Sequence, residues 1–202
     1  MFFVMEHVVR ESARRQYWNA SVHVVAMDPV ETNNTHRVFA YGSNMHLTDL
    51  GRWAKENGRN PPNIMRSYAA VLHDHALVWN YRSVARRGGA ANLATIAGQR
   101  VMGVVLEVDG ATLDLMDTKE GHPGRYSRGS APLNLEGIPS GEPVSAWVYR
   151  VTERWLCDEE IRPTLAYRRL LVEAAKEHGL PQAYIDELNA IPVLEQGRFS
   201  QG

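Results

Sequence analysis

Apolar and polar positions change their period several times along the chain, from the two-residue period of a strand to the period of a helix. The first segment of the main pattern is the β-prone run Arg37–Tyr41, which ends at the turn formers Gly42, Ser43 and Asn44. A helix is predicted next, and its apolar side consists of Met45, Leu47, Leu50 and Trp53. The pattern therefore predicts a strand, a tight turn and a helix in that order.

The middle of the chain is typical of strands separated by turns. The segment Tyr68–Arg82 predicts one long strand or two short ones. Two more strands are predicted over Asn92–Ile96 and Val101–Val108, joined by a turn at Gly98-Gln99. A short helix is expected over Ala111–Met116, because its apolar residues are one helical turn apart.

Strands and helices separate in the last third of the sequence. Strands are predicted over Arg125–Ser130, Pro132–Leu135 and Val144–Val151. Two helices follow, one starting near Pro163 and the other at Pro181, each with apolar residues at helical spacing. Neighbouring strands joined by turns, with helices gathered mainly in the C-terminal part, indicate an α+β fold rather than a parallel α/β sheet.

The domain organisation follows from where this pattern begins and ends. Residues 1–35 are predicted to be an N-terminal extension of unknown role, with a helix over Glu6–Tyr17 and a strand over Ser21–Met27. The main domain is predicted over residues 36–192, and residues 193–202 are predicted to form a polar tail.

Composition narrows the function classes. Of 202 residues, 44% are hydrophobic and 22% are charged, as in ordinary globular proteins. The net charge of −1 lacks the basic excess of a nucleic-acid binder, and no apolar run is long enough to predict a membrane span. The single cysteine, Cys157, excludes an intrachain disulfide and a Cys-rich zinc site. The apolar start Met1–Met5 has no basic region before it, so we expect no secretory signal and a cytoplasmic location.

The turn Tyr41-Gly42-Ser43-Asn44 is the first candidate for chemistry. A glycine-containing turn between a strand and a helix can present several backbone N–H groups to a carboxylate or a developing oxyanion. The alternative is an ordinary strand-to-helix turn. No Gly-Lys-Ser/Thr follows, and the glycine spacing of a nucleophile elbow is absent, so Ser43 is a weak candidate for a nucleophile.

Glu120 is the second candidate, because the sequence predicts it in a loop rich in glycine and proline just after a helix. A carboxylate partly removed from water can exchange protons near neutral pH. The alternative is a solvated loop glutamate.

The remaining candidates are weaker. His73 and His75 share a strand face but lack a third ligand for a metal, and Cys157 lies beside acids that oppose thiolate formation. A cluster of arginines at 82, 86 and 87 could contact an anion or form a solvated loop. Tyr149 and Tyr167 could line a pocket or belong to the core.

Taken in order, several segments resemble one known family, the γ-glutamylcyclotransferases. These segments are Phe39–Asn44, Gly88–Leu93, Gly103–Val105, Leu115–Gly121, Tyr126, Tyr149 and the stretch from Tyr167 to Tyr184. The resemblance covers roughly residues 37–192 and departs in two places. Met116 stands where the family usually has leucine, and residues 1–35 have no counterpart.

The resemblance implies a small mixed β-barrel with flanking helices, and it implies that Glu120 is the catalytic acid and base. It implies a substrate-binding segment consisting of Val38, Phe39, Ala40, Tyr41, Gly42, Ser43 and Asn44, with Tyr149 and Tyr167 lining the site. The implied reaction converts a γ-glutamyl amide into 5-oxoproline and a free amino acid or amine. Because the substrate's own α-amine attacks its own γ-carbonyl, no enzyme nucleophile, metal or cofactor is expected.

Three alternatives stay open at this stage. The leaving group could be the ε-amine of lysine or the amine of a biosynthetic intermediate, and the fold could instead be a binding or regulatory module that captures a small amino-acid-like ligand without turnover. We expect a small molecule as the partner, without nucleic acid or membrane. Whether two copies form a homodimer is left open by the sequence.

Overall fold

The computed structural model describes residues 34–195, so the helix and the strand expected within residues 1–35 lie outside the described residues. The described part is a mixed α+β fold, as predicted. Its strands are β1 (His36–Ala40), β2 (Ile64–Val78), β3 (Arg82–Ser83), β4 (Gly88–Gly89), β5 (Asn92–Val108), β6 (Tyr126–Ser127), β7 (Leu133–Gly137), β8 (Pro143–Ala146) and β9 (Arg150–Val151). Its helices are α1 (Leu47–Glu56), α2 (Gly110–Glu120), α3 (Leu165–Glu177), α4 (Gln182–Ala190) and the short 3₁₀ turns η1 (Ser43–Met45) and η2 (Glu153–Trp155).

The main sheet has five antiparallel strands in the order β1-β5-β2-β7-β8. Its two edges meet at one isolated parallel bridge between Val38 and Trp147. Two backbone hydrogen bonds of 2.8 Å hold this bridge, from the N–H of Phe39 to Trp147 O and from the N–H of Trp147 to Arg37 O. The two edges share only this bridge and are not paired over a longer stretch. The described strands therefore do not form the closed barrel that the resemblance implied.

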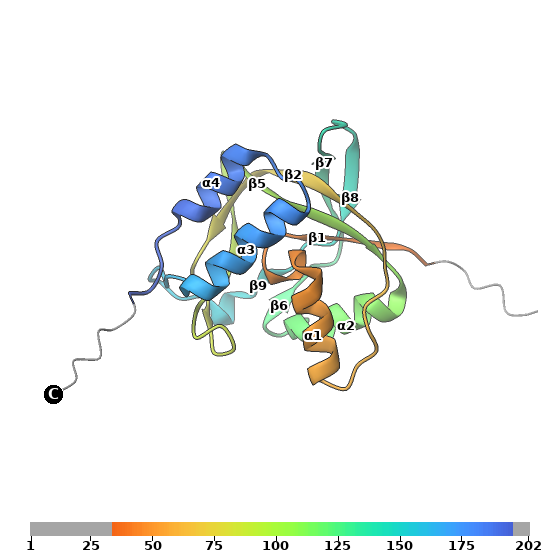
Figure 1. Cartoon of the computed structure of the whole chain (residues 1–202), viewed down its shortest axis with the longest axis horizontal. Helices are drawn as coiled ribbons and strands as arrows, with labels where there is room; N and C mark the ends of the chain where they lie inside the picture. Colours follow the sequence, from red (N-terminus) through yellow and green to blue (C-terminus); the bar gives the residue numbers. More distant parts are fainter. Residues whose placement is uncertain (1–33, 196–202) are drawn as a thin grey trace, which may run out of the picture. The chain divides into compact units, whose positions relative to one another are not determined.

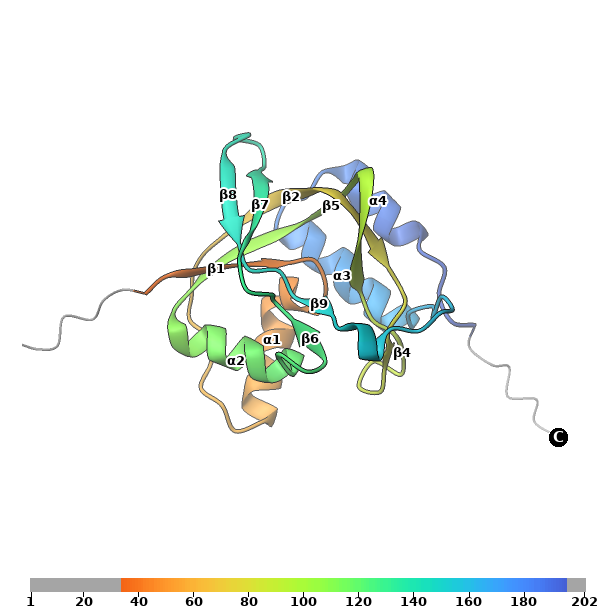
Figure 2. The ribbon, with the colours of Figure 1, turned by 180° about the vertical axis from the view of Figure 1, so that it is seen from behind.

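The helices cover the sheet unevenly. Figures 1 and 2 show α3 and α4 packed side by side, while the β7–β8 hairpin stands out from the rest of the fold. The core draws on both faces of β1 and β5 and on the apolar side of α3, with Val104, Val105 and Leu171 fully buried. Burying each such side chain contributes on the order of 2 kcal/mol, which fixes the strand and helix ends that carry the site.

One predicted turn is wrong. The segments Asn92–Ile96 and Val101–Val108 belong to the single strand β5, and Gly98 lies within it. Gly98 has a φ of +75°, and Asp74 opposite it on β2 has a φ of +56°. The carboxylate of Asp74 accepts a 2.8 Å hydrogen bond from the N–H of Gly98, so the pair forms an irregularity of the ladder rather than its end.

The predicted helix Ala111–Met116 is also longer in the structure. Asp109 caps its N-terminus by accepting a 2.7 Å hydrogen bond from the N–H of Thr112. Gly121, with a φ of +69°, ends it in the left-handed conformation that glycine adopts without strain. Glu120 is therefore the last residue of α2, held by helical backbone, and not a residue of the following loop.

Candidate active site

The turn after β1 contributes the first part of the candidate site. Tyr41 is the first residue after the strand, and η1 follows Gly42 at once. The N–H groups of Met45 and His46 donate within the turn, to the carbonyls of Gly42 and Ser43 at 3.0 and 3.2 Å. The N–H groups of Met45 and His46 are therefore not free to bind an anion at this turn.

The C-terminal end of α2 contributes the second part. Arg125 donates from Nε to the carbonyl of Glu120 at 3.1 Å and from Nη2 to the carbonyl of Lys119 at 2.7 Å. A cation suits this position, because the last carbonyls of a helix carry its negative dipole end. These two hydrogen bonds fix the backbone from which Lys119 and Glu120 project into the cleft.

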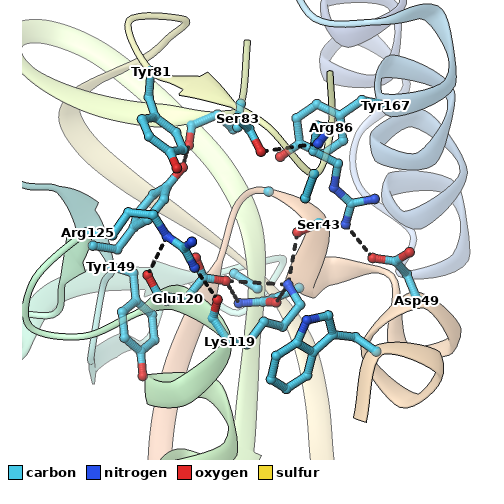
Figure 3. Close-up of a pocket in the computed structure, with 18 of the residues that line it drawn as sticks. Ser43, Asp49, Tyr81, Ser83, Arg86, Lys119, Glu120, Arg125, Tyr149 and Tyr167 are labelled. Carbon is cyan, nitrogen blue, oxygen red and sulfur yellow. Dashed lines mark hydrogen bonds and ion pairs between the residues drawn. The ribbon is translucent and has the colours of Figure 1, made fainter. Parts of the chain in front are cut away.

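The two parts meet although 76 residues separate Asn44 from Glu120. The side-chain amide of Asn44 donates to Oε1 of Glu120 at 3.0 Å. The ammonium of Lys119 donates to Oδ1 of Asn44 at 2.7 Å and to Oγ of Ser43 at 3.2 Å. Figure 3 shows Ser43, Lys119 and Glu120 directed toward one another at the centre of the cleft. The arrangement holds the Glu120 carboxylate and the Ser43 hydroxyl each within hydrogen-bonding reach of the Lys119 ammonium.

Buried tyrosines form the walls around this centre. The hydroxyl of Tyr41 donates to the carbonyl of Tyr149, and the hydroxyl of Tyr149 donates to Oδ1 of Asp117, each at 2.5 Å. Burial raises the pKa of Tyr167 to about 12, so it stays neutral at physiological pH. A Cβ on Gly42 would lie only 3.3 Å from the hydroxyl of Tyr167, so the turn and this ring are in close contact.

One side of the cleft is cationic. Arg86 donates to Asp49 at 2.6 Å and lies over the ring of Tyr167, 5.1 Å from its centroid. Arg52 pairs with the other oxygen of the buried Asp49 carboxylate. Two guanidinium groups therefore share the carboxylate of Asp49, and Arg52 also lies 3.9 Å from the carboxylate of Glu56.

The structure brings together most of the residues that the sequence suggested. A cleft of about 960 Å³ is lined by Phe39, Ala40, Tyr41, Gly42, Ser43, Asn44, Glu120, Tyr149 and Tyr167. Val38 does not line this cleft, because its side chain is fully buried in the core between β1 and its neighbours. A direct contact of Val38 with substrate is therefore not expected, although its neighbours form the cleft wall.

Sequence reasoning did not single out four charged residues of this cleft, namely Asp49, Arg52, Glu56 and Lys119. Lys119 directly precedes Glu120, which was the available signal for it. Nothing in the helical pattern of α1 distinguished the buried Asp49 from a solvated helix carboxylate. Arg86, weighed from sequence only as one of an arginine cluster, proves to be an inward-facing member of it.

Other potential sites are not supported within the described residues. No group of three or more His, Cys, Asp or Glu side chains among residues 34–195 could hold a metal ion. In the same part of the chain, no helix has the length and apolar character needed to cross a membrane.

The pH dependence of the free energy of unfolding tests the ion pairs that Asp49 makes with the arginines of this wall. Burial alone would raise the pKa of its carboxyl, but the hydrogen bond and charge of Arg86, with the charges of Lys119 and Arg52, lower this pKa below 3.8. A carboxyl with a lowered folded-state pKa stabilises the fold above its unfolded pKa and loses that contribution as pH falls through its folded value. We expect the free energy of unfolding to fall as pH drops below about 4.

The variant Asp49→Asn should be less stable at pH 7, by about 1–3 kcal/mol, because Arg86 loses its partner. Its stability should also fall less between neutral and acidic pH than that of the parent. Urea unfolding at both pH values measures this difference, and an unchanged pH dependence in Asp49→Asn would show that Asp49 does not contribute it.

Comparison with known proteins first identifies the class. The AIG2-like family model matches residues 100–188, which run from the second half of β5 through α4. A solved structure named γ-glutamyl cyclotransferase superposes with a TM-score of 0.65 at 26% identity, covering 83% of this chain and 94% of that chain. A yeast cyclotransferase described as specific to glutathione shares the fold alone, at 14% identity and a TM-score of 0.51. The fold is thus that of the solved γ-glutamyl cyclotransferase.

Curated relatives then identify the family. A γ-glutamylcyclotransferase of Bos taurus is 30% identical over 170 residues, which are 81% of this chain and 82% of that protein. The γ-glutamylcyclotransferase of Mus musculus is 29% identical over 176 residues, covering 84% and 86% of the two chains. The chain belongs to the γ-glutamylcyclotransferase family and is an enzyme.

Proposed function

We propose that this enzyme converts a γ-glutamyl amino acid into 5-oxoproline and the free amino acid, with Glu120 as the general acid and base. The substrate's α-amine nitrogen forms a bond to its γ-carbonyl carbon, and the amide bond to the leaving nitrogen breaks. No water is consumed, because one amide replaces another. An oriented intramolecular attack of this kind can reach effective molarities of about 10⁵ M or more.

The position of Glu120 is the observation that supports this proposal most. Its side chain is 14% exposed and lies in the cleft beside the turn after β1. Within residues 34–195 its side-chain hydrogen bonds and ion pair all use Oε1, from Asn44 and Lys119. Oε2 is therefore available to take and return a proton.

Glu120 carries out both proton transfers in this proposal, one from the substrate and one back to it. The α-amine enters as an ammonium, and Glu120 takes its proton to free the attacking lone pair. The tetrahedral intermediate carries an oxyanion, for which the N–H groups of residues 42–44 are the proposed donors. Glu120 then returns its proton to the leaving nitrogen, so that a neutral amine departs.

The charge of the cleft favours an amino acid over a simple amine as the leaving group. Five cationic side chains line the cleft against three carboxylates. The cations are Arg52, Arg82, Arg86, Lys119 and Arg125, and the carboxylates are Asp49, Glu56 and Glu120. The glutamyl half brings one carboxylate and an amino-acid leaving group brings a second. A simple amine would leave part of the cationic wall without a partner.

A panel of purified γ-glutamyl compounds tests the proposed function. We expect 5-oxoproline from γ-glutamyl-alanine, with a lower kcat/KM for γ-glutamyl-ethylamide and for ε-(γ-glutamyl)-lysine. Preference for the lysine compound would favour the amine-cleaving alternative. Tight binding of one compound without 5-oxoproline from any of them would favour a binding module and contradict the proposal.

We expect Arg86 to bind the carboxylate of the leaving group. Replacing its guanidinium in Arg86→Met should raise the KM for γ-glutamyl-alanine about tenfold or more, the scale of a lost charge-assisted hydrogen bond. The KM for γ-glutamyl-ethylamide should change much less, because that leaving group has no carboxylate. Steady-state kinetics of 5-oxoproline release on both substrates measures the difference.

Arg52→Met is the matched control, because Arg52 pairs with the same carboxylate of Asp49 but its side chain is 61% exposed. It should affect the two substrates to a similar, small extent. An equal rise in KM for both substrates in Arg86→Met would assign Arg86 to the glutamyl half or to structure alone.

A further inference from the structure

Lys119 is an unusually buried lysine beside the proposed acid and base. Its side chain is 7% exposed, against 14% for Glu120. An ammonium has three N–H donors and no acceptor. The structure offers it three oxygens: Oδ1 of Asn44 at 2.7 Å, Oγ of Ser43 at 3.2 Å and Oε1 of Glu120 at 3.5 Å.

The ammonium dictates the orientation of the Asn44 amide. Because Lys119 can only donate, the amide oxygen of Asn44 must face it. The NH₂ group of the amide is then turned to Glu120, where it donates to Oε1 at 3.0 Å. A flipped amide would set its NH₂ against the ammonium and its oxygen against the carboxylate, so both contacts would become repulsive.

The ammonium also dictates the direction of the Ser43 hydroxyl. Its oxygen accepts a hydrogen bond from Lys119, so its own hydrogen must point away from the ammonium. Ser43 lines the cleft, and Figure 3 shows its side chain directed to the centre of the site. The hydroxyl is thereby left as a donor for an oxygen atom bound in the cleft.

We propose that Lys119 is a positioning residue that fixes two neighbours at once: it orients Ser43 as a hydrogen-bond donor to the γ-carbonyl oxygen of the substrate, and it orients Asn44 as the partner of Glu120. This inference rests on the proposed function. Lys119 itself transfers no proton and contacts no reacting atom. Its three donors are all used inside the protein.

A double-mutant cycle tests this role. Lys119→Met keeps the length of the side chain and removes every donor, so kcat should fall about 10²-fold, as when one oxyanion donor is lost. KM should stay near that of the parent. Ser43→Ala alone should lower kcat on a similar scale, and the combined variant should lose little more than Lys119→Met, because Ser43 is then no longer oriented.

The orientation of Asn44 supplies a readout that does not depend on turnover. In proton–nitrogen correlation NMR spectra, the side-chain NH₂ signals of Asn44 can be assigned by their loss in Asn44→Asp. In the parent these signals should show a hydrogen-bonded amide. In Lys119→Met these signals should move toward those of a free amide. If Lys119→Met does not fold, Lys119→Met/Glu120→Gln removes both charges together and is compared with Glu120→Gln alone.

The outcomes separate this inference from the proposed function. Fully additive losses of kcat in the cycle, or unchanged Asn44 signals on loss of Lys119, would overturn the positioning role. Full 5-oxoproline release by Glu120→Gln would instead overturn the proposed acid and base while leaving the NMR result to stand. Thermal unfolding of each variant shows whether a loss of kcat reflects a loss of fold.

Discussion

Glu120→Gln should keep the fold and lose roughly 10²–10⁴ in kcat, the usual scale for removing a general acid or base. Glutamine has nearly the shape of glutamate, so its amide oxygen can still accept from Asn44 at the position that Oε1 now occupies. What it cannot do is take a proton from the substrate ammonium and return it to the leaving nitrogen. Binding should suffer less than turnover, because the cationic wall and the turn after β1 are unchanged.

The measurement is 5-oxoproline release from γ-glutamyl-alanine at saturating concentration. Glu56→Gln is the control, since Glu56 also lines the cleft but its side chain is 65% exposed. We expect its kcat to stay close to that of the parent. Parental activity in Glu120→Gln would remove Glu120 from the mechanism, and an equal loss in Glu56→Gln would point to a general effect of cleft charge.

The order of the elements was predictable because local signals and tertiary contacts agree along most of the chain. The strand over Arg37–Tyr41 and the two C-terminal helices have clear periods and clear ends, and the structure places β1, α3 and α4 there. Glycine misled the prediction at Gly98, where a positive φ marks an irregularity inside a long strand. That distinction depends on the partner residue Asp74 across the ladder, which no local pattern contains.

The candidate site was predictable in its two segments but not in their contact. The turn at Gly42–Asn44 and the end of α2 each have a local signature, and the family resemblance joins them. The hydrogen bond between Asn44 and Glu120 depends on the packing of α2 against β1, which single-sequence patterns do not specify. Charged residues such as Lys119 and Asp49 could not be distinguished from surface residues, because the burial of a charge becomes visible only with its partners in place.

The second large expected effect concerns Gly89, the last residue of the short strand β4. Its N–H donates to the carbonyl of Arg162 at 2.9 Å, so two backbones run in direct contact. A Cβ on Gly89 would lie 1.6 Å from the carbonyl oxygen of Ile161. No rotamer relieves a clash with backbone, so Gly89→Ala should lower the free energy of unfolding by about 3 kcal/mol or more.

Gly51→Ala is the matched control, and we expect it to raise the free energy of unfolding instead of lowering it. Gly51 lies within α1, and nothing stands within 4 Å of a Cβ added there. Alanine should therefore stabilise this helix by up to about 1 kcal/mol. Urea unfolding of both variants measures the contrast, and equal stability of Gly89→Ala and the parent would contradict the close approach of β4 to residues 161–162.

The consequence of Gly89→Ala for activity follows from what β4 holds. β4 pairs with β3, and the loop between them carries Arg86 to the cleft. A displaced β4 moves Arg86 away from Asp49, so the surviving folded fraction should show the raised KM for γ-glutamyl-alanine expected of Arg86→Met. Its KM for γ-glutamyl-ethylamide should rise less. A loss of stability with an unchanged preference between the two substrates would show that Arg86 keeps its place without this strand, because the anchor to Asp49 then suffices.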